Sequence, residues 1–118
     1  MSEDFVKRVD TLATELTVTG EIDTGAVSSP QTVLTPSSGK KIDTRSVYLA
    51  SDSTSGEVEI RFASSGTLLG KIYCSKFALI TLDAVHLTGA TDEAVEIAWS
   101  DLDTGAKIFY SIRYKEVA

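Results

Sequence analysis

Two copies of the tripeptide Asp-Thr-Gly are the residues in this chain whose types could support catalysis. One copy begins at Asp23 and the other begins at Asp103. Two aspartates held against each other can share one proton and activate a water molecule for peptide hydrolysis. The same tripeptide is common in turns, because the aspartate caps the turn and the glycine accepts a positive φ. We favour the turn, because a glutamate, Glu21, lies just before Asp23 and would be costly to bury beside a catalytic pair.

The segment Asp23-Thr24-Gly25-Ala26 resembles the active-site signature of retroviral-type aspartic proteases. Residues 68–71, Leu-Leu-Gly-Lys, loosely resemble the later apolar motif of that family. The family places a helix after this motif and carries a glycine-rich flap, whereas residues 72–82 here read as strand and no flap is found. The resemblance implies an obligate dimer with both copies of Asp23 on the two-fold axis. We keep this protease as an alternative function.

The acidic segment 101–105 could bind a cation. It reads Asp-x-Asp-x-Gly, which is half of a calcium loop. An EF-hand needs further oxygen ligands and a glutamate near position 112, where this chain has Ile112. A hairpin loop is therefore the favoured interpretation, and a surface cation site is the alternative.

Single reactive side chains lack the neighbours that catalysis needs. Cys74 is the only cysteine, so no internal disulfide is possible, and it ends the apolar run 72–74. His86 is the only histidine and alternates with apolar residues, which directs it outward. A lone histidine supports neither a zinc site nor a catalytic triad. We predict no catalytic, cofactor-binding or metal-binding residues and no cofactor, and hence no enzyme.

Other polar groups have structural explanations. Residues 39–41, Gly-Lys-Lys, lack the rest of a phosphate-binding loop, so a turn with basic residues accounts for them. Asp92, Glu93 and Glu96 could form a carboxylate pair for acid–base chemistry. Glu96 alternates outward from its apolar neighbours, which favours a solvated face.

Five aromatic residues could form a platform on which sugars stack: Tyr48, Tyr73, Trp99, Tyr110 and Tyr114. Flat rings bind glycans in this way in many sandwich folds. Most of these rings lie at inward positions of alternating segments. Core packing is therefore favoured, and a ligand platform is the alternative.

From residue 31 onward the chain reads as short strands separated by turn residues. Alternation is clearest in 57–63, where Val58, Ile60 and Phe62 should face the core. Turn signals recur about every ten residues, and no helical pattern lies between the strands. We predict an all-β fold, an antiparallel β-sandwich or jelly roll of about eight or nine strands. Eight strands are expected at residues 31–35, 41–51, 57–63, 67–74, 77–82, 85–88, 93–99 and 107–115.

The start of the chain is predicted to differ from the rest. We divide it into an N-terminal arm, residues 1–30, and a β-sandwich domain, residues 31–118. Residues 16–19 alternate like a strand and would be the ninth. A short amphipathic helix, or an arm that orders on a partner, is predicted from apolar residues at helical spacing: Phe5, Val9, Leu12 and Leu16.

The composition of the chain limits the classes of partner that it is expected to bind. The chain has 118 residues, enough for one domain, and 17 acidic against 11 basic residues give a net charge of −6. Phosphates would be repelled, so we expect no nucleic acid partner. No apolar run approaches the roughly 20 residues that cross a membrane, and residues 1–4 lack a signal-peptide pattern. We therefore expect synthesis in the cytoplasm and no membrane partner.

The order of features from Thr32 to Lys115 resembles small jelly-roll-like β-sandwich proteins encoded among the virion genes of tailed phages and archaeal viruses. The resemblance implies a non-enzymatic virion structural protein, such as a capsid decoration, a turret or a tail component. It implies a homo-oligomer, with a trimer favoured, that binds a major capsid protein or another virion protein. The segments that carry it are 33–42, 47–51, 56–62, 70–73, 87–93 and 112–114.

A stand-alone glycan-binding or ligand-binding module is the second hypothesis. It predicts a monomer with an exposed aromatic groove, whereas the virion protein predicts a symmetric oligomer and the protease a tight dimer. The virion structural protein is the function that we favour from the sequence.

Overall fold

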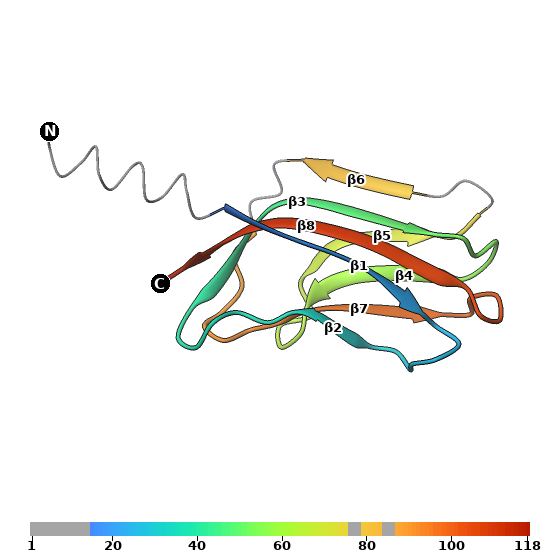
Figure 1. Cartoon of the computed structure of the whole chain (residues 1–118), viewed down its shortest axis with the longest axis horizontal. Coiled ribbons are helices and arrows are strands. Elements are labelled where there is room, and N and C mark those ends of the chain that lie inside the picture. Colours follow the sequence, from blue (N-terminus) through green and yellow to red (C-terminus); the bar gives the residue numbers. More distant parts are fainter. Residues whose placement is uncertain (1–14, 76–78, 84–86) are drawn as a thin grey trace, which may run out of the picture.

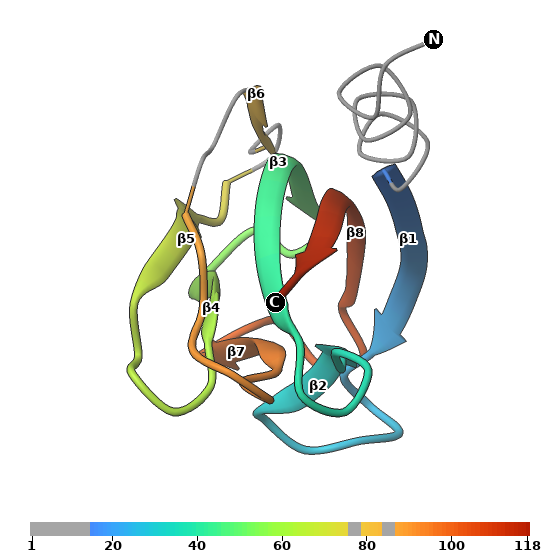
Figure 2. The same cartoon turned by 90° about the vertical axis from the view of Figure 1, so that its left-hand side faces the viewer.

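Two four-stranded antiparallel sheets pack face to face in this protein (Figures 1 and 2). The computed structural model describes residues 15–75, 79–83 and 87–118, and these ranges contain no helix. The strands are β1 (Glu15–Asp23), β2 (Gln31–Leu34), β3 (Lys41–Ser51), β4 (Glu57–Phe62), β5 (Leu68–Tyr73), β6 (Leu79–Asp83), β7 (Val95–Ser100) and β8 (Lys107–Val117).

The strand order is that of a jelly roll. One sheet has the order β1-β8-β3-β6 and the other has the order β2-β7-β4-β5. Each strand of the first half therefore pairs with its counterpart counted from the end: β1 with β8, β2 with β7, β3 with β6 and β4 with β5. The chain is thus one long hairpin, with the β4–β5 turn at its tip, and the hairpin is folded into two layers. The predicted fold class is confirmed.

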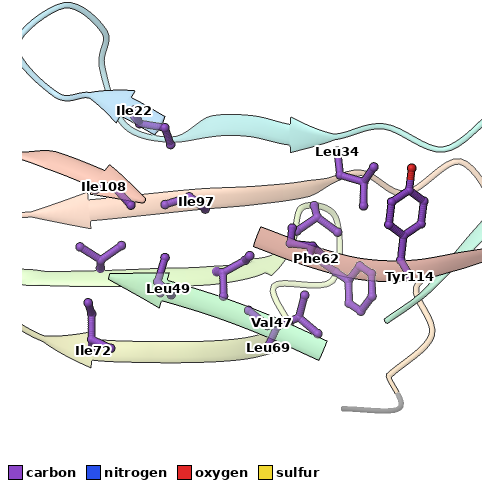
Figure 3. Packing of buried hydrophobic residues seen from close by; sticks show 14 of the residues in the cluster. Ile22, Leu34, Val47, Leu49, Phe62, Leu69, Ile72, Ile97, Ile108 and Tyr114 are labelled. Atoms are coloured by element: carbon purple, nitrogen blue, oxygen red, sulfur yellow. The ribbon is translucent and has the colours of Figure 1, made fainter. Parts of the chain in front are cut away.

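The core lies between the two sheets, as alternation along the strands predicts (Figure 3). Val58, Ile60 and Phe62 in β4 are at most 1% exposed, which confirms that they face inward. The charged residues between them face solvent on the outer face of the sheet. Each of these buried side chains stabilises the fold, because it is removed from water and makes dispersion contacts with its close-packed neighbours. The buried apolar cluster is Ile22, Leu34, Ile42, Val47, Leu49, Val58, Ile60, Phe62, Leu69, Ile72, Cys74, Val95, Ile97, Ile108, Ile112 and Tyr114.

Two features differ from the sequence-based expectation. The eight strands described lie within the predicted eight or nine, but where a strand at 85–88 was expected, Thr88 makes only an isolated bridge with Asp43. Residues 85 and 86 of that segment, the second of which is His86, lie outside the described residues. The strand expected at 16–19 is longer than predicted, since β1 pairs with β8 over nine positions.

The expected N-terminal arm can be compared with the structure only in part. Residues 1–14, which hold most of the predicted helix, lie outside the described residues. Leu16, the last of its apolar positions, belongs to β1 and is 44% exposed. The division of the chain at residue 30 stays a prediction, and the strand within it belongs to the same sheet as the C-terminal strand.

Three loops gather at one end of the sandwich, on the right in Figure 1. They connect β1 to β2, β3 to β4 and β7 to β8, and each passes from one sheet to the other. Both copies of Asp-Thr-Gly lie in these loops, because Asp23 ends β1 and Asp103 precedes β8. This end of the molecule therefore holds both Asp-Thr-Gly turns and the acidic segment 101–105.

Candidate functional site

The two Asp-Thr-Gly turns lie side by side because β1 and β8 are neighbours. The register pairs Asp23 with Lys107. The backbone N–H and the hydroxyl of Thr24 both donate to the Ala106 carbonyl, at 3.1 and 2.6 Å. A Cβ added to Gly25 would lie 3.4 Å from the Cα of Gly105. Long-range pairing thus brings two separate tripeptides into one structural unit.

Asp103 ties this unit to the β3–β4 loop. Its carboxylate accepts hydrogen bonds from the Thr54 backbone N–H at 2.7 Å, the Thr54 hydroxyl at 2.8 Å and the Ser55 hydroxyl at 2.9 Å. The Asp103 backbone N–H donates in turn to the Ser53 hydroxyl at 2.9 Å. The Thr54 N–H, followed by these hydroxyls, lowers the pKa of the Asp103 carboxyl below its usual value. Asp103 therefore acts as a charged clamp between two loops.

Asp23 has the geometry of a turn residue. Its carboxylate accepts the Gly25 N–H at 2.9 Å, and its carbonyl accepts the Ala26 N–H at 3.0 Å. A protease dyad needs one of its carboxyls to hold a proton through a raised pKa. The carboxyl of Asp103 has a lowered pKa and is hydrogen-bonded within its own loops. Within one chain the two aspartates thus form turns rather than a proton-sharing pair.

Two adjoining hollows lie beside the turns. The larger, of about 390 Å³, is lined by Thr24, Gly25 and residues 99–105, and we call it the Trp99 pocket. The smaller, of about 150 Å³, is lined by Glu57, Glu59, Ala98, Trp99 and Ser100. Trp99 and Ser100 belong to both. The larger hollow has the size of a small-molecule site, which is typically 300 to 1,000 Å³.

Ion pairs cover the outer face of the β4 sheet. Arg61 contacts Glu96, with 2.8 Å between Nε and Oε1, and it also pairs with Glu59. Lys71 lies 3.5 Å from the Glu57 carboxylate. The outward position predicted for Glu96 is confirmed, and its carboxylate is engaged by an arginine. Because an arginine engages the Glu96 carboxylate, the geometry does not support acid–base chemistry by Glu96.

Glu93 is a buried structural carboxylate, whereas a solvated face was the favoured interpretation for the group of Asp92, Glu93 and Glu96. Its side chain is buried, and the residue is 4% exposed. Its carboxylate accepts the backbone N–H groups of Ser65 at 2.6 Å and Ala90 at 2.9 Å. Burial raises the pKa of Glu93, but these N–H donors lower it more, so the net pKa lies below its usual value. Glu93 fastens the β4–β5 turn to the loop before β7, and no local pattern signals that contact.

The remaining candidates are structural where the structure describes them. Cys74 is buried, and burial raises the pKa of its thiol, which disfavours the reactive thiolate. Gly39 has φ +79°, and its N–H donates to the Asp92 carboxylate at 2.7 Å. A phosphate loop would point that N–H at an anion of the ligand, so here a carboxylate of the chain takes that place.

Neither a metal cluster nor a membrane span is found among the residues described. Over residues 15–75, 79–83 and 87–118, no three His, Cys, Asp or Glu side chains are placed to hold one metal ion. Within the same ranges no helix is long and apolar enough to cross a membrane. Asp101 has φ +58°, a left-handed conformation that aspartate tolerates.

The aromatic residues divide between the core and the surface. Tyr114 is buried and Tyr110 is half-buried above Gly20. Tyr73 is 71% exposed on β5, with the Lys71 ammonium 5.2 Å from its ring centre. Trp99 is half-buried and packs against the core while lining the Trp99 pocket. A continuous platform of five rings is therefore not formed, but one tryptophan borders a hollow.

Comparisons with known proteins agree with the fold. No protein-family model matches the chain, and a search of curated proteins finds no match. Among solved structures, a chain of the cyanophage Pam1 capsid asymmetric unit superposes with a TM-score of 0.56 and 18% identity, over 88% of this chain and 85% of that chain. The carbohydrate-binding module CBM36, in complex with calcium and xylotriose, gives a TM-score of 0.41 and 15% identity, over 86% of this chain and 99% of that chain. At 18% identity the likeness to the capsid chain concerns the fold alone.

Proposed function

We propose that this protein is a non-enzymatic structural component of a virion. The observation that carries the proposal is the likeness of its fold, over 88% of the chain, to a chain of a cyanophage capsid. Its jelly-roll strand order is one that recurs in viral capsid proteins. A capsid decoration, a turret or a tail component, made in the host cytoplasm and assembled into the particle, fits this fold.

Assembly on itself and on a neighbouring virion protein is part of the proposal, with a trimer favoured. The surface offers strand edges for it, since β1 is a nine-residue edge strand and β5 is one of the two edge strands of the other sheet. Exposed edges are natural sites for pairing with another chain. Two copies of β1 paired antiparallel would place Glu15 opposite Asp23, and like charges opposed in this way repel. The edge of β1 thus favours a partner other than its own copy.

A retroviral-type protease is not proposed. The carboxylate of its signature residue, Asp23, accepts the Gly25 N–H and caps its own turn. The three functions predicted from the sequence also differ in oligomeric state, which makes native mass the measurement that separates them.

Light scattering on a size-exclusion column, at low and at high salt, tests the proposal. We expect three times the chain mass of 12.6 kDa, or a larger ring. A stable dimer, or a monomer at all concentrations, would contradict symmetric assembly of the favoured kind. Co-sedimentation with particles from a culture of the source, followed with an antibody against the chain, tests the virion assignment itself. A chain that stays in the soluble fraction while particles pellet would reject it.

A further inference from the structure

The Trp99 pocket combines an aromatic wall with polar groups on the loops around it. Its lining contains the hydroxyl-bearing residues Thr24, Ser100 and Thr104 and the acidic residues Asp101 and Asp103. Ligand sites are typically hollows in which apolar surface meets a few convergent polar groups. The virion function proposed above leaves this hollow unused.

Most of the carboxylates around the two hollows are already engaged. Those of Asp103, Glu57 and Glu59 contact loop hydroxyls, Lys71 and Arg61 respectively. Among the described residues, the Asp101 carboxylate is the one in the lining without a hydrogen-bond or ion-pair partner. The wall therefore presents one available carboxylate among hydroxyls, rather than a cluster of bare negative charges.

The walls are fixed in position before any ligand arrives. Gly56 has φ +84°, and a Cβ there would lie 2.3 Å from the Ser100 carbonyl oxygen, so the β3–β4 loop packs directly against the pocket lining. The Ser55 hydroxyl donates to the Asp101 carbonyl at 3.1 Å, and Asp103 is clamped as described above. A site whose groups are already ordered loses less entropy on binding.

We propose that the Trp99 pocket binds a neutral saccharide. Sugars have an apolar C–H face that packs on an aromatic ring and hydroxyls that donate to a carboxylate. In this assignment the Trp99 ring contacts the sugar face, and the Asp101 carboxylate and the Thr104 hydroxyl bind its hydroxyls. A net charge of −6 disfavours anionic glycans. Binding here is independent of the virion assignment, so either proposal can fail without the other.

Tryptophan fluorescence reports directly on this pocket, because Trp99 is the only tryptophan. The full-length protein is titrated with cellotriose and maltotriose, with trigalacturonic acid as an anionic probe of equal length and trilysine as a cationic probe. We expect a saturable change with a neutral trisaccharide and none with the two charged probes. The proposal would be overturned if neither neutral sugar, at up to about 10 mM, changed the fluorescence or gave heat in calorimetry. Specific complexes, even weak ones, would be detected at that concentration. A stronger response to either charged probe would overturn it as well.

Matched aspartate variants test the site. Asp101 and Asp92 are the two non-glycine residues with positive φ in the described chain, and they flank opposite ends of β7. Asparagine tolerates the same conformation, so both variants should fold. We expect Asp101→Asn to weaken binding about tenfold or more, since a neutral amide replaces the charged acceptor of the sugar hydroxyls, and Asp92→Asn to leave it unchanged. Equal affinity of Asp101→Asn and Asp92→Asn for the sugar would place the sugar elsewhere and reject the assignment. So would a double variant, Asp101→Asn with Thr104→Ala, that binds the sugar as tightly as the wild type.

Discussion

At the scale of single residues, one buried carboxylate, that of Glu93, holds two loops of this protein together. Glu93 is 4% exposed and accepts backbone N–H groups from two separate loops, at Ser65 and at Ala90. A charged acceptor strengthens such hydrogen bonds and leaves a large penalty if it is removed. Ion pairs on the surface, such as Glu21 with Lys107, contribute far less because water and salt screen them.

Replacing Glu93 with glutamine should lower the free energy of unfolding by about 1.5–3 kcal/mol, because an uncharged amide replaces the acceptor of two buried N–H groups. Urea denaturation followed by circular dichroism measures it. The control is Glu21→Gln, whose exposed ion pair should cost less than about 1 kcal/mol. If the two variants lost the same free energy of unfolding, burial of the Glu93 carboxylate would not strengthen its contribution to stability.

At the scale of elements, the turns determine how the strands are connected. Gly66, in the β4–β5 turn, has φ +73°, and its N–H donates to the Phe62 carbonyl at 3.0 Å. Gly56, between β3 and β4, has a similar φ but packs against the backbone of Ser100 and Asp101. Both positions favour glycine for its backbone, and Gly56 has in addition no room for a side chain.

Alanine substitution at these two glycines should separate backbone strain from crowding. Gly66→Ala should cost about 1–2 kcal/mol, the penalty of a left-handed conformation, since nothing lies within 4 Å of the added Cβ. Gly56→Ala should cost about 3 kcal/mol or more, because the Cβ would lie 2.3 Å from a backbone oxygen and the loop must move. Thermal unfolding of both variants gives the comparison, and a smaller loss at Gly56 than at Gly66 would refute the packing argument.

At the scale of the whole molecule, the jelly roll is closed by contacts between the first and last strands. β8 pairs with β1 on one side and β3 on the other, and it carries Ile108 and Ile112 into the core. The loops at one end pass between the sheets and are joined by the Asp103 clamp. Stability of the whole sandwich therefore depends on ionised carboxyls as well as on apolar burial.

Acid should destabilise the protein. The pKa values of Glu93 and Asp103 in the folded state lie below their ordinary values of 4.5 and 3.8, so the unfolded chain binds protons first as the pH falls. The stabilising effect is complete above the ordinary pKa values and is lost progressively below about pH 5. Urea midpoints measured from pH 7 to pH 3 should fall in the wild type and fall less steeply in Glu93→Gln. Parallel curves for the two proteins would contradict the role of Glu93.

Local sequence patterns were sufficient for the strands and their inner faces. Alternation in 57–62 predicted that Val58, Ile60 and Phe62 are buried, because successive side chains of a strand point to opposite faces. Turn residues such as Gly56 and Gly66 separated one strand from the next. Recurrent short strands without helices then limited the fold class to a sandwich or a jelly roll.

Only the tertiary structure decided which strands are neighbours and what their loops form together. Thr24 and Ala106 are 82 positions apart, yet they are joined by hydrogen bonds since β1 closes against β8. The burial of Glu93 accompanies another long-range pairing, that of β4 with β7, and the hollow beside Trp99 is lined by loops from both halves of the chain. Pairing between distant strands depends on the packing of the whole core, whereas local alternation records only which face of each strand is apolar. The sequence by itself thus determined the elements, and the tertiary structure determined the site.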